Sequence, residues 1–471
     1  MSAAARARPP LGDARGTEPV AYRLLRNVAR LLLWIFYRRI EVVGLDRIPA
    51  LGPVILAANH QNALVDPTLL LAGIPRRLVP VAKAPLFRHP LVSPLLRALG
   101  AIPVHRRQDA GSDPAHNEAM FGAAAAALRR GLAVLVFPEG VSQPEPRLMP
   151  LRTGAARMLL AAEQAAPSPL GVRLLPVGLI LDDPGVFRVG RALVLVGRPV
   201  VTEDCLGLQV TEPEEAVRRL TERLAETLRR LIVEAGDRQV LALVRIAESI
   251  WSEESGWAPR EIVPRAEWRR RAARAYRFLL ARRPERAEAL RTQLERYAKD
   301  LELAGLGGRQ LGRDYSAAAV RRYALREGTS LLLGFPLAVL GMVIHALPYG
   351  LTALAVRLLR PEPDVEATSK LAAGALLYPL CWSGEGWAAW QLGGPWGLAA
   401  LLVALAPTAF FALTWSERLR RMAREARGFL AFLLDRDLHG HLRERRRAIM
   451  EEFQALVREV PESVLTGGDG E

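Results

Sequence analysis

Short apolar runs alternate with longer amphipathic stretches between residues 40 and 198. A continuous apolar run bounded by turn residues is typical of a buried strand, whereas apolar residues spaced roughly three or four apart indicate a helix. Alternation of the two predicts an α/β sandwich with a central sheet. The predicted strands are 40–43, 54–58, 78–82, 134–137, 174–181 and 192–196. Helices are predicted between them at 67–72, 91–99, 117–130 and 154–164.

The pattern becomes helical and highly charged after residue 202. Amphipathic helices rich in Arg and Glu are predicted over 211–235, 240–251 and 265–303, within a helical region that spans 203–328. Thr211 and Glu214 have the spacing of a capping box, so the first of these helices is expected to begin there.

Three apolar stretches follow, at 331–347, 371–392 and 396–415, and the first continues past Pro348. Each of the last two has the roughly 20 residues that cross a bilayer, which predicts C-terminal transmembrane helices within 329–416. Arginines on both flanks place both on the cytoplasmic side, and this requires an even number of crossings. Simple counting gives three, and a re-entrant hairpin broken at Pro348 would resolve the difference. Buried hydrophobic hairpins of a soluble protein are the alternative. The flanking arginines are Arg321, Arg322 and Arg326 before the set and Arg418, Arg420 and Arg421 after it.

The two ends of the chain differ from the regions between them. Residues 1–21 are rich in Ala, Arg, Pro and Gly and are expected to be disordered. Residues 22–39 form an amphipathic helix that either lies in a membrane interface or packs on the soluble core. Residues 417–471 form a basic helical tail.

The formal net charge of +15 comes almost wholly from arginine, because only three of the 64 basic residues are lysines. A basic chain with apolar segments favours anionic lipid headgroups as partners over nucleic acid, for which no motif is present. No metal-ligand spacing and no glycine-rich nucleotide loop can be recognised, so no cofactor is expected.

Polar residues with possible catalytic roles follow the buried run 53–58. They are Asn59, His60 and, six residues after His60, Asp66. A histidine can accept a proton near neutral pH, and a carboxylate can fix its tautomer and stabilise the imidazolium. No nucleophilic Ser or Cys follows at a matching place, so the pair is interpreted as a general base acting on a substrate hydroxyl. Residues six apart on a helix lie about 120° around its axis, so a turn leading into a helix must bring the two together.

Three further blocks occur in order after this pair. They are Gly100-Ala101-Ile102-Pro103-Val104-His105-Arg106, then Phe137-Pro138-Glu139-Gly140, then Leu175-Pro176-Val177. Together with Asn59, His60 and Asp66, they resemble the four motifs of the glycerolipid acyltransferase superfamily, over roughly residues 40–200.

The resemblance implies an acyltransferase-type fold and a membrane-bound enzyme without a cofactor. The enzyme would transfer a fatty acyl group from acyl-CoA or acyl carrier protein to glycerol-3-phosphate or 1-acylglycerol-3-phosphate. It implies His60 as base, Asp66 as its partner, and membrane lipids as the surroundings, at the cytoplasmic face of a bacterial inner membrane. The residues expected to bind substrate are Asn59, Arg106, Glu139, Gly140 and Arg152.

The sequence departs from the family at one place. Five residues separate His60 from Asp66, whereas the commonest pattern has four. This spacing resembles a minority branch that includes fungal-type glycerol-3-phosphate acyltransferases, and it leaves the acceptor open. Dihydroxyacetone phosphate, an ornithine lipid precursor and another lysolipid are the other acceptors. A non-catalytic lipid-binding protein on the same fold is the alternative of another class.

Overall fold

The computed structural model describes residues 18–90, 92–105, 114–182, 190–257, 259–304, 317–361, 366–434 and 436–466. The chain divides into two compact units. Unit 1 comprises Met1–Asp237, Glu261–Ala266 and Pro363–Thr368, and unit 2 comprises Arg238–Arg260, Glu267–Glu362 and Ser369–Glu471.

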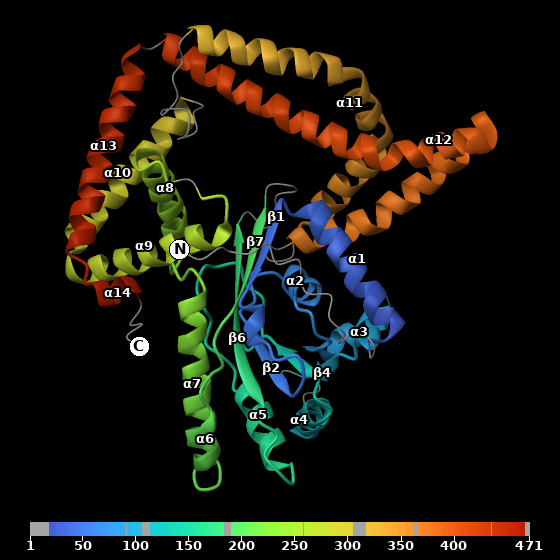
Figure 1. The fold of residues 1–471 in the computed structure, drawn as a ribbon, viewed down its shortest axis with the longest axis vertical. Helices are drawn as coiled ribbons and strands as arrows, with labels where there is room; N and C mark the ends of the chain where they lie inside the picture. The colour runs from blue at the N-terminus through green and yellow to red at the C-terminus, as the bar shows by residue number, and fades with distance from the viewer. Residues whose placement is uncertain are drawn as a thin grey trace. The chain divides into compact units, whose positions relative to one another are not determined.

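Unit 1 is built on a seven-stranded sheet with the strand order β1-β7-β6-β2-β5-β3-β4 (Figure 1). Neighbouring strands are parallel, except that β6 and β7 are antiparallel. The strands are β1 Arg39–Val43, β2 Val54–Ala58, β3 Leu78–Lys83, β4 Ile102–Val104, β5 Ala133–Val136, β6 Arg173–Asp182 and β7 Arg191–Val196. All six predicted strands are present. The unpredicted β4 has only three residues, which is too short to show a periodicity.

Helices cover both faces of this sheet. Ile55 and Ala57 of β2 belong to a core cluster with α4, α5 and α7. Val54, Leu56 and Ala58 alternate with them, so they point to the opposite face and are also fully buried. The helices of unit 1 are α1 Val20–Phe36, α2 Val65–Gly73, α3 Ser93–Leu99, α4 Pro114–Arg129, α5 Gly154–Gln164, α6 Glu203–Leu208 and α7 Pro213–Leu231, with 3₁₀ turns η2 Leu45–Arg47 and η3 Ala84–Arg88. The predicted α/β fold is therefore confirmed.

Helix α1 has two apolar faces. One is buried within unit 1, where the Tyr22 hydroxyl accepts a hydrogen bond from Leu78 N (2.7 Å). The other is an exposed stripe that includes Leu24 and Trp34, which are 62% and 58% exposed. The helix thus packs on the soluble core and also presents apolar side chains to the outside.

The capping box predicted for α7 is wrong. The helix begins at Pro213, and its N-cap residue is Glu212, which makes no side-chain capping bond. The Thr211 hydroxyl instead donates to Leu208 O (3.4 Å). Proline is favoured at the first helical position because its fixed φ suits a helix and it has no N–H to satisfy. Pro213 therefore sets the start of α7 two residues after Thr211.

Unit 2 is helical. Its elements besides the two apolar helices are α8 Arg238–Glu254, α9 Ile262–Arg282, which begins in unit 1, α10 Pro284–Leu303, α13 Arg436–Arg458 and α14 Glu462–Thr466. Arg446 of α13 forms ion pairs with Glu253 (2.7 Å) and Glu254 (2.5 Å) of α8. The predicted helical segment 265–303 contains two helices, because Pro284 begins a new one.

The predicted apolar stretches lie in α11 Ala317–Leu359 and α12 Glu366–Leu434, both long and apolar enough to cross a membrane. A re-entrant hairpin broken at Pro348 is one way to obtain an even number of crossings, but α11 continues through Pro348. The non-helical residue lies instead at Gly394 of α12, with φ 59° and ψ −150°. A Cβ on Gly397 would collide with the carbonyl of Ala389, so the two arms of α12 fold back on each other.

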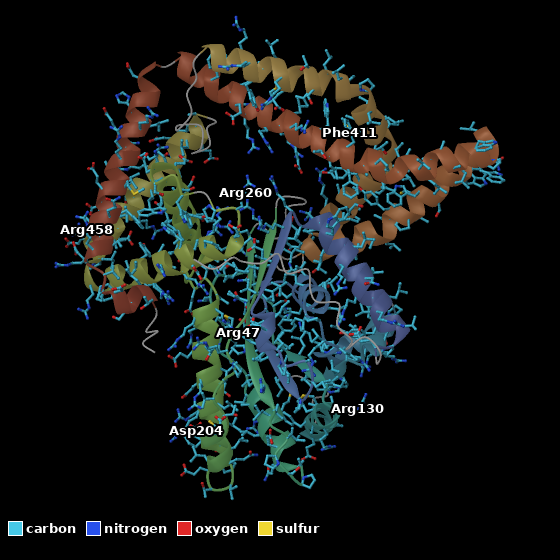
Figure 2. All side chains as sticks on the ribbon, viewed as in Figure 1. Arg47, Arg130, Asp204, Arg260, Phe411 and Arg458 are labelled. Atoms are coloured by element: carbon cyan, nitrogen blue, oxygen red, sulfur yellow. The ribbon has the colours of Figure 1, made fainter. Side chains whose placement is uncertain are left out.

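Close packing also joins α11 to the second arm of α12. A Cβ on Gly334 would lie 2.9 Å from the ring of Phe411, which Figure 2 labels on α12. His345 of α11 is buried, and its Nε2 lies 3.1 Å from Leu405 O. Small residues at such contacts allow helices to approach closely, as in membrane-embedded bundles.

Candidate active site

His60 and Asp66 meet at the end of the central strand β2. His60 Nδ1 lies 2.9 Å from Asp66 Oδ2, across a turn that leads from β2 into the first turn of α2. The ring of His60 stacks on Phe137, which follows β5, with centroids 4.1 Å apart. No hydrogen bond to His60 Nε2 occurs within the described ranges. The second ring nitrogen is therefore the atom available to a substrate.

One oxygen of Asp66 organises the turn. Oδ2 accepts hydrogen bonds from Gln61 N (2.6 Å) and Asn62 N (2.7 Å) in addition to its contact with His60. The residue is fully buried, so the carboxylate is withdrawn from water and these donors replace its hydration. Carboxylate contact at Nδ1 leaves the proton-accepting lone pair of neutral histidine on Nε2. The geometry suits a general base that faces away from Asp66.

Glu139 connects the turn after β5 to the turn after β2. Its Oε1 accepts a hydrogen bond from His60 N (2.7 Å) and its Oε2 accepts one from Met149 N (3.0 Å). The same loop reaches His60 again, since Gln143 N donates to His60 O (3.0 Å). Burial raises the pKa of Glu139, while the two backbone donors favour its charged form. Glu139 thus fixes the backbone of His60 through a hydrogen bond.

We expect Glu139→Gln to destabilise unit 1 although the two side chains have the same shape. Glutamine has one acceptor oxygen for two N–H donors, so its amide group must face a backbone N–H. One buried bond is lost, at a cost of about 1–3 kcal/mol. Thermal unfolding measures this as a lower Tm. The control is Glu118→Gln on the exposed surface of α4, and equal Tm values for the two variants would contradict the assignment.

Gly140 and Arg152 lie together beside Glu139. Gly140 has φ +73°, which strains any residue with a Cβ, and that atom would lie 3.4 Å from Arg152 Cγ. Arg152 N donates to Pro138 O (2.7 Å), which fixes the arginine to the same loop. Its side chain is exposed, and among the described residues its guanidinium forms no ion pair or hydrogen bond. Within the described part of the chain, the Arg152 guanidinium is therefore a free cation of this loop.

The residues of this site lie in a part of the chain that matches a known protein family. Residues 39–180 match the Acyltransferase family, and the matched range contains His60, Asp66, Glu139 and Arg152. Residues 39–180 form an acyltransferase-family domain. The resemblance predicted from the four motifs is confirmed for this part of the chain.

Several curated proteins are similar to part of the chain. An uncharacterized acyltransferase of Schizosaccharomyces pombe is 23% identical over 310 residues, which cover 48% of this chain and 46% of that protein. A 1-acyl-sn-glycerol-3-phosphate acyltransferase of Borreliella burgdorferi is 25% identical over 214 residues, with coverages of 44% and 79%. Glycerol-3-phosphate O-acyltransferase 2 of Saccharomyces cerevisiae is 31% identical over 117 residues, with coverages of 25% and 16%. The chain thus spans less than half of the two yeast proteins.

The predicted substrate-binding residues of the acyltransferase domain are placed differently from one another. Asn59 is buried, and its side-chain amide bonds both Leu179 N (2.6 Å) and Leu179 O (3.1 Å), so it ties β6 to the end of β2. Arg106 lies outside the described residues. Gly140 and Arg152 lie at the loop surface and Glu139 beneath it. Substrate binding by these five residues stays a prediction.

Sequence reasoning missed Phe137, Asn62 and Gln143 as parts of the acyltransferase site. Phe137 belongs to a recognised motif, but a motif does not reveal that its ring stacks on His60. Gln143 contributes only its backbone N–H, and every residue except proline has one. Asn62 carries a weak signal, since Asn side chains often hydrogen-bond the backbone in turns, and its Oδ1 accepts from Val65 N (3.2 Å).

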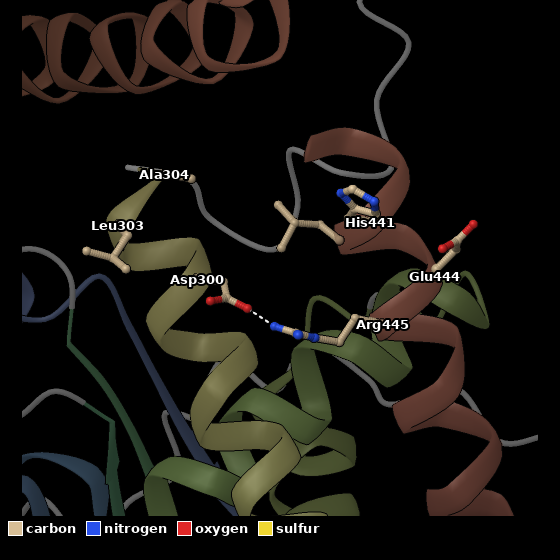
Figure 3. Close-up of a pocket in the computed structure, with 7 residues that line it drawn as sticks. Asp300, Leu303, Ala304, His441, Glu444 and Arg445 are labelled. Atoms are coloured by element: carbon tan, nitrogen blue, oxygen red, sulfur yellow. Dashed lines mark hydrogen bonds and ion pairs between the residues drawn. The ribbon is translucent and has the colours of Figure 1, made fainter. Parts of the chain in front are cut away.

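A hollow in unit 2 contains no residue of the acyltransferase domain. It lies between α10 and α13, where an ion pair joins Asp300 to Arg445, with His441 and Glu444 at its edge (Figure 3). Among the described residues, no cluster of three or more His, Cys, Asp or Glu side chains could hold a metal ion.

Proposed function

We propose that the protein transfers a fatty acyl group from a thioester to the hydroxyl of a phosphate-bearing glycerol, in phospholipid synthesis. The observation that carries the proposal is the His60–Asp66 contact at 2.9 Å, with His60 Nε2 free within the described residues. Such a pair can activate an alcohol without a covalent enzyme intermediate. The donors are acyl-CoA or acyl carrier protein, and the acceptors are glycerol-3-phosphate or 1-acylglycerol-3-phosphate.

The chemical step needs only proton movement at His60. Its Nε2 takes the proton of the acceptor hydroxyl as that oxygen attacks the thioester carbonyl carbon. The new ester bond forms, the carbon–sulfur bond breaks, and the proton leaves the imidazolium to neutralise the departing thiolate. Asp66 stabilises the transient imidazolium through Nδ1. Glu139 and Gln143 hold the His60 backbone during the cycle.

Arg152 supplies the positive charge that a phosphate requires. It is exposed, free of ion pairs within the described residues, and fixed to the loop that carries Glu139. An arginine can bind phosphate bidentately with its planar fork.

Arg152→Ala is therefore expected to raise the KM for the phosphate-bearing acceptor about 10- to 100-fold, with a small change in kcat. This follows from a charged hydrogen bond being worth about 1.5–3 kcal/mol. Arg152→Lys should be intermediate, because it keeps the charge but not the fork. Arg129→Ala at the exposed end of α4 is the control. A KM unchanged in Arg152→Ala would remove this residue from the acceptor site.

A membrane surface is the proposed location. The exposed stripe on α1 combines Leu24, Leu31 and Trp34 with the basic residues Arg23 and Arg30, a pattern suited to anionic lipid headgroups. Two further helices, α11 and α12, have the length and composition of membrane spans. The arginine-rich flanks of these helices favour the cytoplasmic face, which in a bacterial cell is that of the inner membrane.

The experiment that tests the proposal uses a panel of acceptors. Membrane and soluble fractions containing the full chain are incubated with labelled acyl-CoA or acyl carrier protein and one acceptor at a time. Glycerol-3-phosphate and 1-acylglycerol-3-phosphate are compared with dihydroxyacetone phosphate, an ornithine lipid precursor and a neutral lysolipid. Label in the first two products, formed in the membrane fraction, supports the proposal. Label only in another product reassigns the acceptor, and no labelled lipid at all favours a lipid-binding protein.

A further inference from the structure

The turn that carries His60 and Asp66 is completed by a side chain from far along the sequence. Thr368 lies in the first turn of α12 and is the last residue of the segment Pro363–Thr368, which belongs to unit 1, whereas the rest of α12 belongs to unit 2. Its hydroxyl donates to Asn62 Oδ1 (2.9 Å) and accepts a hydrogen bond from Leu64 N (3.2 Å). Both partners lie among the five residues between His60 and Asp66. One hydroxyl therefore joins two points of the interval.

Asn62 links Thr368 to the carboxylate of Asp66, because it hydrogen-bonds both residues. Its side-chain Oδ1 accepts from Thr368 and from Val65 N, and its backbone N donates to Asp66 Oδ2 (2.7 Å). The residue is only 2% exposed, so water cannot readily replace a lost partner. A change in the orientation of Asn62 would shift one of the three donors on Asp66.

Within the described residues, a remote hydroxyl accepts one backbone donor of the interval between His60 and Asp66. Asn62 accepts hydrogen bonds from the first two residues of α2, from Val65 N with its side chain (3.2 Å) and from Asp66 N with its carbonyl (3.3 Å). Leu64 lies just before the helix, and within the described part of the chain its N–H finds its acceptor in Thr368. The Thr368 hydroxyl therefore accepts the hydrogen bond of Leu64 N, a donor that the local bonds to Asn62 do not satisfy.

We propose that Thr368 is a positioning residue of the acyltransferase site, acting through Asn62 and Leu64 on the His60–Asp66 turn. The inference rests on the proposed function for its kinetic consequence, but its geometric content does not depend on the reaction. The segment after the acyltransferase-family domain thus contributes a group to the site, although the family match ends at residue 180.

The first test compares Thr368→Val with Thr368→Ser in the full-length protein. Valine keeps the shape and removes the hydroxyl, whereas serine keeps the hydroxyl. We expect Thr368→Val to lower kcat about 3- to 30-fold, from two hydrogen bonds of ordinary net strength, with KM values for donor and acceptor within about twofold. Thr368→Ser should recover most of kcat, which loss of packing alone would not predict. The control is Thr221→Val in α7, whose hydroxyl, among the residues that the structure describes, bonds only Val217 O of its own helix (2.7 Å).

A second measurement reads the turn directly. Hydrogen–deuterium exchange of peptides covering residues 60–66 should be faster in Thr368→Val than in the wild type and near the wild type in Thr368→Ser. Unchanged exchange in Thr368→Val, or equal kcat in the wild type and Thr368→Val, overturns the inference. If the wild type itself transfers no acyl group, the proposed function fails and exchange still decides the positioning contact.

A double-mutant cycle with Asn62→Ala tests the route of the coupling. If Thr368 acts through Asn62, the two substitutions together should lower kcat by less than the product of their separate effects. A fully multiplicative loss would mean that Thr368 affects catalysis elsewhere, and it would overturn this assignment.

Discussion

Replacing His60 with alanine should lower kcat for acyl transfer by about 10²–10⁴-fold or more, the range of a positioned general base. The ring is the group whose Nδ1 contacts Asp66 and whose Nε2 is free within the described residues. Its removal leaves the backbone bonds of His60 to Glu139 and Gln143 in place, so the fold should persist. KM for the thioester should change little, because His60 contacts the donor only as the reaction proceeds.

The control for His60→Ala is His441→Ala, which removes an exposed histidine of unit 2. Circular dichroism and membrane fractionation should give the same results for wild type and both variants. Turnover of His60→Ala within a few-fold of the wild type would remove His60 from the chemical step.

Asp66→Asn is expected to lower kcat about 10²–10⁴-fold while the protein stays folded. Asparagine keeps the shape of the side chain, and its oxygen can still accept from Gln61 N and Asn62 N. It lacks the negative charge that stabilises the imidazolium and fixes the tautomer. The amide group would occupy the place of Oδ1, which is buried and has no hydrogen-bond partner among the described residues. We therefore also expect a loss of about 1–3 kcal/mol of stability.

This prediction is checked by measuring kcat and Tm together. Asp46→Asn, on the exposed 3₁₀ turn η2, is the matched control and should leave both unchanged. An Asp66→Asn variant with lower Tm but undiminished kcat would show that the carboxylate has a structural role only.

The strands that position the site could be predicted because each is a continuous apolar run. β2, β5 and β6 are almost wholly buried, so their sequences report burial directly. Parallel pairing of β2 with β5 then brings the residues after Ala58 and Val136 to the same edge of the sheet. For this reason, the approach of the Phe137–Gly140 loop to His60 follows from the pattern.

What could not be predicted depends on backbone partners and on distant segments. Glu139 was recognised as part of a motif, but it bonds the backbone N–H groups of His60 and Met149. Because nearly every residue has a backbone N–H, the sequence does not show which ones it bonds. Thr368 stands 306 residues from Asn62, and a single threonine carries no signature of such a contact. The prediction of a capping box at Thr211 was wrong because α7 begins at Pro213, and proline is favoured at the first helical position.

Acceptor-dependent release of CoA tests the central claim most directly. Purified full-length protein and the His60→Ala variant are given acyl-CoA with and without glycerol-3-phosphate or 1-acylglycerol-3-phosphate, and free thiol is measured beside labelled lipid, with acyl carrier protein as the second donor. We predict that the wild type releases thiol only when an acceptor is present, in equal amounts with acylated product, and that the variant releases almost none. Thiol release by the wild type without any acceptor, or equal release by the variant, would contradict the account.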